Sequence, residues 1–175
     1  LFEAMLALHE ATGDDSHLET ATRLFELTRS KFIVDNTLRE YFTDALDPVP
    51  GEAGEIVEPG HHMEWVWLLH RYAVAADAPA AAALAGTLYE FSLAHGYDAV
   101  SGGLHDEVTA RGNVYRDDRR LWPQTEALKA HVARLQDAGD DAARNRLEGG
   151  IESLFRYHLM GPPGGWREHI HSDGE

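Results

Sequence analysis

The chain has 175 residues, and its 43% hydrophobic content is sufficient for one domain with a buried core. Its 15 basic and 30 acidic residues give a net charge of −15, which excludes nucleic acid and anionic membrane surfaces as expected partners. The sequence contains no cysteine, and no apolar run approaches the roughly 20 residues of a membrane span. We therefore expect a soluble globular protein without disulfides, and the cytoplasm as its compartment.

Three predicted pairs of helices follow one another along the chain. Each pair is joined by a short turn that ends in Asp, and the aspartates of successive turns are 63 residues apart. The turns are Thr12-Gly13-Asp14, Ala75-Ala76-Asp77 and Ala138-Gly139-Asp140. The amphipathic helices that follow these turns cover residues 17–31, 79–95 and 141–158. This period predicts a helix hairpin that is repeated three times.

Longer polar and aromatic segments lie between the helix pairs and lack helical spacing. Residues 37–42 are a short strand candidate, residues 102–108 and 111–115 predict a hairpin, and residues 166–171 alternate like a strand. Because these segments always occur at the same kind of junction, we expect them to gather on one face of a toroid of helices. That face is where a functional site is expected.

Both ends of the chain look interrupted. The first helix begins at Leu1 without a capping residue before it. The last strand runs into Asp173-Gly174, a hairpin-turn dipeptide, and no returning strand follows. No linker divides the chain, so we expect residues 1–175 to form a single partial domain of a longer protein.

The helix that follows Pro59-Gly60 begins with the most distinctive polar groups. His61 and Glu64 are three residues apart, so both lie on one face of the first turn of an otherwise apolar helix. One interpretation is a general acid/base imidazole that is oriented by a carboxylate. The alternatives are an N-terminal capping cluster, or a metal site that also includes His62. Adjacent helical residues do not face one ion, which disfavours the metal site.

A second distinctive stretch surrounds Pro123, a residue typical of the first turn of a helix. Trp122 precedes it and would lie at the mouth of the helix, where an indole can stack on the apolar face of a sugar ring. Gln124 can donate hydrogen bonds to sugar hydroxyls and accept them. The structural alternative is that Trp122 only plugs the end of the helix.

Together these motifs resemble those of the N-acylglucosamine 2-epimerase family, which includes mannose isomerases, related aldose–ketose isomerases and cellobiose 2-epimerases. The resemblance covers essentially the whole chain and rests on the order and spacing of several short motifs. They are Leu1-Phe2-Glu3-Ala4, Ala11-Thr12-Gly13-Asp14, Pro59-Gly60-His61 with Glu64-Trp65, Gly102-Gly103, Trp122-Pro123-Gln124, and Gly165-Trp166. The resemblance implies an all-α (α/α)6 barrel, with short β-hairpins in the loops on one face, of which this chain would be the second half.

The resemblance also implies a chemistry, which is proton transfer at the carbon next to a sugar carbonyl, without a metal or redox cofactor. His61 would be the acid/base and Glu64 its supporting carboxylate. Trp122, Gln124 and Glu3 would contact the substrate, a monosaccharide or sugar derivative. A second catalytic histidine and several site residues of the family would lie outside this chain, and a homo-oligomer is possible.

The main interpretation is therefore a sugar aldose–ketose isomerase of the mannose–fructose type. One alternative is a 2-epimerase that acts on an N-acylated or other sugar. A second is a glycoside hydrolase or lyase on the same barrel, which would need opposed carboxylates from Asp106, Glu107 and Glu126. The third is a non-catalytic helical-repeat module for binding or oligomerisation.

Overall fold

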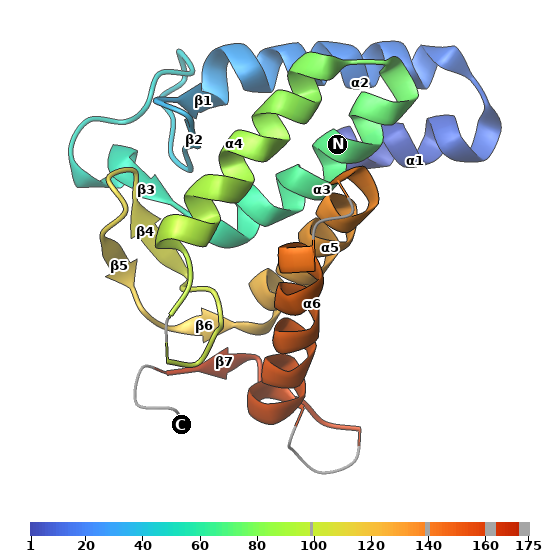
Figure 1. The fold of residues 1–175 in the computed structure, drawn as a ribbon. Helices are drawn as coiled ribbons and strands as arrows, with labels where there is room; N and C mark the ends of the chain where they lie inside the picture. Colours follow the sequence, from blue (N-terminus) through green and yellow to red (C-terminus); the bar gives the residue numbers. More distant parts are fainter. Residues whose placement is uncertain (99, 139–140, 160–163, 172–175) are drawn as a thin grey trace.

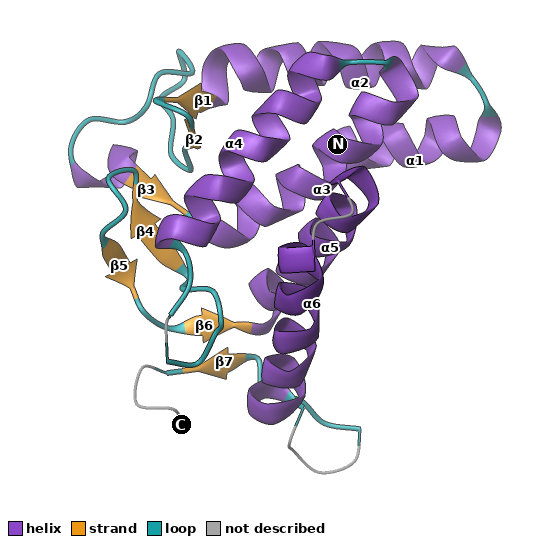
Figure 2. Cartoon of the chain, in the orientation of Figure 1, coloured by secondary structure: helices purple, strands orange, loops and turns teal. Residues whose placement is uncertain are grey.

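The computed structural model describes residues 1–98, 100–138, 141–159 and 164–171, and these contain six α-helices (Figures 1 and 2). The helices are α1 (Phe2–Thr12), α2 (Asp15–Leu27), α3 (Pro59–Ala76), α4 (Pro79–His95), α5 (Leu121–Ala138) and α6 (Asp141–Ser153). Short π-helical segments over Thr28–Phe32 and Leu154–His158 extend α2 and α6, and a 3-10 turn covers Glu52–Glu55. The predicted helix hairpins are confirmed, with α4 matching its predicted bounds.

The turns within the hairpins follow from their sequence. Gly13 ends α1 in the left-handed conformation that glycine adopts without strain (φ 70°), and Asp77 ends α3 in the same region (φ 48°). The Asp14 carboxylate then accepts a hydrogen bond from the Ser16 amide and caps α2. Asp140, the aspartate of the third predicted turn, lies outside the described residues.

The strands are short and lie together at one side of the helices, whereas the turns that join α1 to α2 and α3 to α4 lie at the other (Figure 1). They are β1 (Ile33–Val34), β2 (Thr37–Leu38), β3 (Ile56–Val57), β4 (Glu107–Thr109), β5 (Val114–Arg116), β6 (Arg119–Arg120) and β7 (His169–Ile170). Antiparallel ladders join β1 to β2, β3 to β4, β4 to β5, and β6 to β7. The predicted gathering of the loops on one face is thus confirmed.

Two strand predictions need correction. The candidate over residues 37–42 is a strand only in β2, because its partner β1 has just two residues and offers no further ladder. The strand over residues 166–171 is shortened to β7, and it has a partner, since Arg119 pairs with Ile170 and Arg120 with His169. The predicted turn at Asp173-Gly174 lies outside the described residues.

Helix α3 is the centre of the core. It packs against α4 and α5, and also against α1 and α2, and Met63, Val66 and Leu69 on it are fully buried. This confirms that the nearly all-round apolar sequence after Gly60 is a buried helix. None of the helices in the described ranges is both long and apolar enough to cross a membrane.

Candidate active site

The N-terminus of α3 opens on the strand side of the molecule, beside the N-terminus of α5. Strand β3 leads directly into α3 through Glu58, and strand β6 leads directly into α5. This arrangement brings His61 next to Trp122, with their ring centroids 4.9 Å apart. The structure therefore joins two sequence-predicted site residues that are far apart in the chain.

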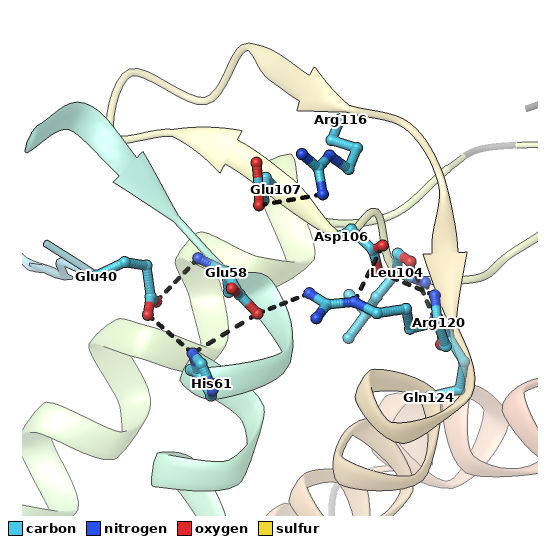
Figure 3. A network of polar contacts seen from close by, with 9 residues as sticks. All are labelled: Glu40, Glu58, His61, Leu104, Asp106, Glu107, Arg116, Arg120 and Gln124. Atoms are coloured by element: carbon cyan, nitrogen blue, oxygen red, sulfur yellow. Dashed lines mark hydrogen bonds and ion pairs between the residues drawn. The ribbon is translucent and has the colours of Figure 1, made fainter. Parts of the chain in front are cut away.

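Glu40 is the carboxylate that holds the imidazole of His61 (Figure 3). His61 Nδ1 lies 3.0 Å from Glu40 Oε2, and Glu40 Oε1 accepts a hydrogen bond from the Glu58 amide at 3.1 Å. An ionised carboxylate can only accept, so Nδ1 of His61 carries the proton of this contact. In the neutral ring Nε2 then holds the lone pair, which is the form that can remove a proton from a substrate.

The environment of His61 favours its charged form. Burial lowers the pKa of His61, but the hydrogen bond and charge of Glu40, with the charges of Glu58 and Glu64, outweigh burial and raise this pKa above 6.5. The side chain is still 36% exposed, so it remains accessible from solvent. An accessible imidazole can take up a proton and return it, and the raised pKa of His61 favours the uptake.

Glu58 links this histidine to a second set of polar groups. Its Oε2 is 3.8 Å from His61 Nδ1 and accepts a hydrogen bond from Arg120 Nη2 at 2.8 Å (Figure 3). Arg120 also contacts the buried Asp106, whose Oδ2 is 3.1 Å from Nε. Burial raises the pKa of Glu58, and the charge of Glu40 adds to this effect, whereas His61 and Arg120 oppose it. Arg120 is therefore already paired with two carboxylates.

Glu64 is near His61 but is not its hydrogen-bond partner among the described contacts. Its charge contributes to the raised pKa of His61. Burial raises the pKa of Glu64 itself, and the charges of Glu126 and Glu3 contribute in the same direction, which places these carboxylates of α1, α3 and α5 near one another. Its role as supporting carboxylate stays a prediction, and Glu40 is the orienting group that the sequence did not reveal.

Gln124 is buried and uses both ends of its amide on the protein. Its Oε1 accepts from the Leu104 amide at 2.7 Å, and its Nε2 donates to the Leu104 and Arg120 carbonyls at 3.0 Å (Figure 3). The structure thus gives Gln124 a role in fixing the loop at Leu104, and its predicted contact with substrate remains untested. Trp122 is half-buried, and Glu3 is exposed.

Within the described ranges, the cluster with the spacing of metal ligands differs from the set that the sequence suggested. Ligand atoms of Glu40, Glu58 and His61 lie within 4.8 Å of one another. His62 is fully buried and packs against Phe91, so it does not join them. The Glu58 carboxylate already faces Arg120, whose positive charge opposes a cation at this position.

Replacing Glu40 by Gln is expected to lower the pKa of His61. The substitution removes the charge and charge-assisted hydrogen bond that raise this pKa, and leaves burial, which lowers it. An NMR titration of the His61 ring measures the change. Glu26→Gln on the exposed surface of α2 is the matched control and should leave the titration of His61 unchanged. An unchanged pKa in the Glu40 variant would show that this contact does not set the protonation of His61.

Gly60 permits the close approach of α3 to α5. A Cβ at this position would lie 2.8 Å from Cβ of Pro123 and 2.9 Å from the Trp122 ring. We expect Gly60→Ala to lower the free energy of unfolding by about 1–3 kcal/mol through overpacking. Gly86→Ala in α4, where a Cβ meets nothing within 4 Å, should instead be stabilising by about 0.4–1 kcal/mol. Urea denaturation of both variants measures the contrast, and equal effects would argue against a tight α3–α5 contact.

Comparisons with solved structures identify this fold. The crystal structure of a D-mannose isomerase superposes with a TM-score of 0.88 at 19% identity, over 99% of this chain and 47% of that chain. The cellobiose 2-epimerase from Bacillus thermoamylovorans B4167 gives a TM-score of 0.86 at 17% identity, over 99% and 44%. The helix hairpins with a loop-covered face are those of an (α/α)6-barrel protein, as expected from the sequence.

The chain belongs to the N-acylglucosamine 2-epimerase family, whose model matches residues 1–175. It is 36% identical over 186 residues to a mannose-6-phosphate isomerase of Rhizobium meliloti (strain 1021). This match covers 99% of the present chain and 47% of that protein. The chain thus spans about half the length of the relatives that it matches.

Proposed function

We propose that the protein is a sugar aldose–ketose isomerase of the mannose–fructose type, in which His61 is the general acid/base. The observation that supports this most directly is the imidazole held at Nδ1 by Glu40, with the Trp122 ring beside it. Family membership and the names of the similar proteins point to sugar isomerisation or epimerisation. Glu40 orients the ring, and Trp122 forms an apolar wall against which a sugar can pack.

The proposed reaction acts on the open-chain sugar. The C2–H bond breaks and its proton goes to Nε2 of His61. The electron pair forms the C1=C2 double bond while the π electrons of the C1 carbonyl move to O1, which gives an enediolate. Return of a proton to C1, with transfer of a proton from O2 to O1, gives the ketose. Return to the opposite face of C2 would give the 2-epimer. Removal of the C2 proton by His61 is common to both outcomes, whereas delivery to the opposite face of C2 needs a second proton donor or a rotation of the intermediate. Product identity therefore distinguishes isomerase from epimerase.

The test is to incubate the full-length gene product with mannose in deuterated water and follow the products by NMR. Formation of fructose supports the isomerase, and deuterium at the carbon next to the carbonyl supports exchange of the transferred proton with solvent. Glucose without fructose would replace the proposal by a 2-epimerase. Absence of turnover with mannose and with a panel of other aldoses would leave the family assignment and remove the isomerase proposal.

The charges around His61 favour a neutral sugar over a phosphorylated one. Glu40, Glu58 and Glu64 all act on His61, and the nearby cation Arg120 is paired with Glu58 and Asp106. We expect kcat/KM for mannose to exceed that for mannose 6-phosphate by about tenfold or more, because like charges brought together weaken binding. Parallel progress curves at low and high salt measure this ratio. Equal or greater efficiency with the phosphate ester would contradict a specificity set by these carboxylates.

A further inference from the structure

The segment that carries Glu40 has little regular structure to hold it. Strand β2 ends at Leu38, and its ladder with β1 joins only two residue pairs. Asp35 and Asn36 form the connection in the left-handed conformation, with φ of 49° and 65°, as in a tight hairpin turn. Arg39 donates its amide to the Phe32 carbonyl at 3.1 Å, which secures the edge of β2 that faces β1.

The opposite edge of β2 is held by a side chain of α3. The buried amide of Leu38 donates to Nε2 of His62 at 2.9 Å, where a further strand would otherwise be needed. His62 is completely buried, and its ring packs against Phe91 with centroids 5.1 Å apart. The acceptor therefore has a fixed position in the core, and it fixes the backbone of Leu38.

Two consecutive residues of α3 thus hold the same segment of chain. The side chain of His62 holds the backbone amide of Leu38, and the side chain of His61 contacts the carboxylate of Glu40, two residues after Leu38. A shift of β2 along α3 would move both contacts together. We infer that His62 is a positioning residue, which anchors Leu38 to Glu40 against α3 and so keeps the Glu40 carboxylate on His61.

This role requires a neutral His62. A ring nitrogen that accepts a hydrogen bond carries no proton, and burial is the main cause that lowers the pKa of His62 to about 4. His62 therefore stays an acceptor throughout the range in which His61 titrates. The two neighbouring histidines divide two tasks, since one exchanges protons and the other does not.

The experiment compares His62→Leu, which removes the acceptor, with His62→Gln, whose amide oxygen can take the place of Nε2. The measurement is the pKa of His61, obtained by NMR titration of the chain with labelled histidine. Loss of the anchor should lower the pKa of His61 in the Leu variant, and the Gln variant should restore it. Tyr72→Phe, which removes a hydrogen bond to Thr22 from the same helix, is the control and should leave this pKa unchanged.

The readout does not depend on turnover, so it can fail independently of the proposed isomerase. An unchanged His61 titration in a folded His62→Leu variant would overturn the inference. An equal decrease in the pKa of His61 in His62→Leu, His62→Gln and Tyr72→Phe would also overturn it. If the Leu variant does not fold, the wild-type chain still provides a test. A scalar coupling between the Leu38 amide nitrogen and Nε2 of His62 is expected across the hydrogen bond, and its absence would also overturn the inference.

Discussion

His61→Asn is expected to lower kcat for mannose isomerisation by about 10²–10⁴-fold, the usual contribution of a general acid/base. Asparagine is close to histidine in size, and its side-chain amide can donate to Glu40. In the wild-type chain Nδ1 of the imidazole makes this contact. The substitution therefore removes the titrating group and retains the contact that orders it. Because the side chain is 36% exposed and lies outside the packed core, stability should change little.

Steady-state kinetics and thermal unfolding of the same preparations measure both effects. His17→Asn on α2 is the matched control, since it makes the same chemical change at a half-buried surface position away from α3. Activity within tenfold of wild type in the His61 variant would refute its role as acid/base. A large loss of stability would instead assign His61 to the cap of α3.

Acidification from pH 6.5 to pH 4 is expected to destabilise the fold through two buried neutral histidines. Burial lowers the pKa of His62 to about 4, and burial with the charge of Arg146 lowers the pKa of His131 to about 4. The unfolded chain protonates these rings near pH 6.5, so in this window it binds more protons than the folded chain. The contribution of each neutral ring to the free energy of unfolding is complete above pH 6.5 and is lost as the pH falls. Between pH 6.5 and pH 4 the loss is about 2–3 kcal/mol per ring, because the slope approaches roughly 1.4 kcal/mol per pH unit.

The contacts of His131 explain why its charged form is unfavourable. Its ring nitrogens lie 2.9 Å from the Tyr89 and Tyr97 hydroxyls, so the neutral ring can donate to one phenol and accept from the other. Protonation would make both nitrogens donors in a site that is 1% exposed. Urea unfolding at several pH values gives the slope of the free energy of unfolding against pH. This slope should be smaller in His131→Gln than in wild type. A wild-type slope in that variant would contradict the assignment.

Other groups with shifted pKa values also contribute to the pH dependence of stability, and the signs of their contributions differ. The raised pKa values of Glu58 and Glu64 favour the folded state as the pH falls, because it binds their protons first. The raised pKa of His61 gives stability that is complete below pH 6.5 and is lost as the pH rises through its folded value. Comparing the free energy of unfolding of His131→Gln and His61→Asn with that of wild type at the same pH separates these contributions.

The helices could be predicted from sequence because their signals are local. Apolar residues at helical spacing, a proline at the start of α3 and of α4, and Gly13 or Asp77 at the end of a helix are each visible within a few positions. The same holds for the proximity of His61 and Glu64 on one helical turn. The strands were harder, since ladders of two or three residues have almost no periodicity of their own.

Glu40 was missed for a related reason. It reaches His61 across a loop with many prolines and glycines, and its position depends on the Leu38–His62 hydrogen bond, which joins residues 24 positions apart. No local pattern encodes such a contact. The residue type of Gln124 predicted a sugar contact, which stays a prediction, whereas its hydrogen bonds to the Leu104 backbone had no local signal in the sequence.

The strand pairs have a consequence for the order in which the molecule folds. Strands β3 and β4 flank the whole α3–α4 hairpin, and β6 and β7 flank the α5–α6 hairpin. Contacts within each helix hairpin are nearer in sequence than the strand pairs, so they close shorter loops and are favoured early. Each hairpin returns the chain to the same side, after which its flanking strands can meet. We therefore expect the β3–β4 and β6–β7 ladders beside His61 and Trp122 to form after the helix hairpins that they enclose.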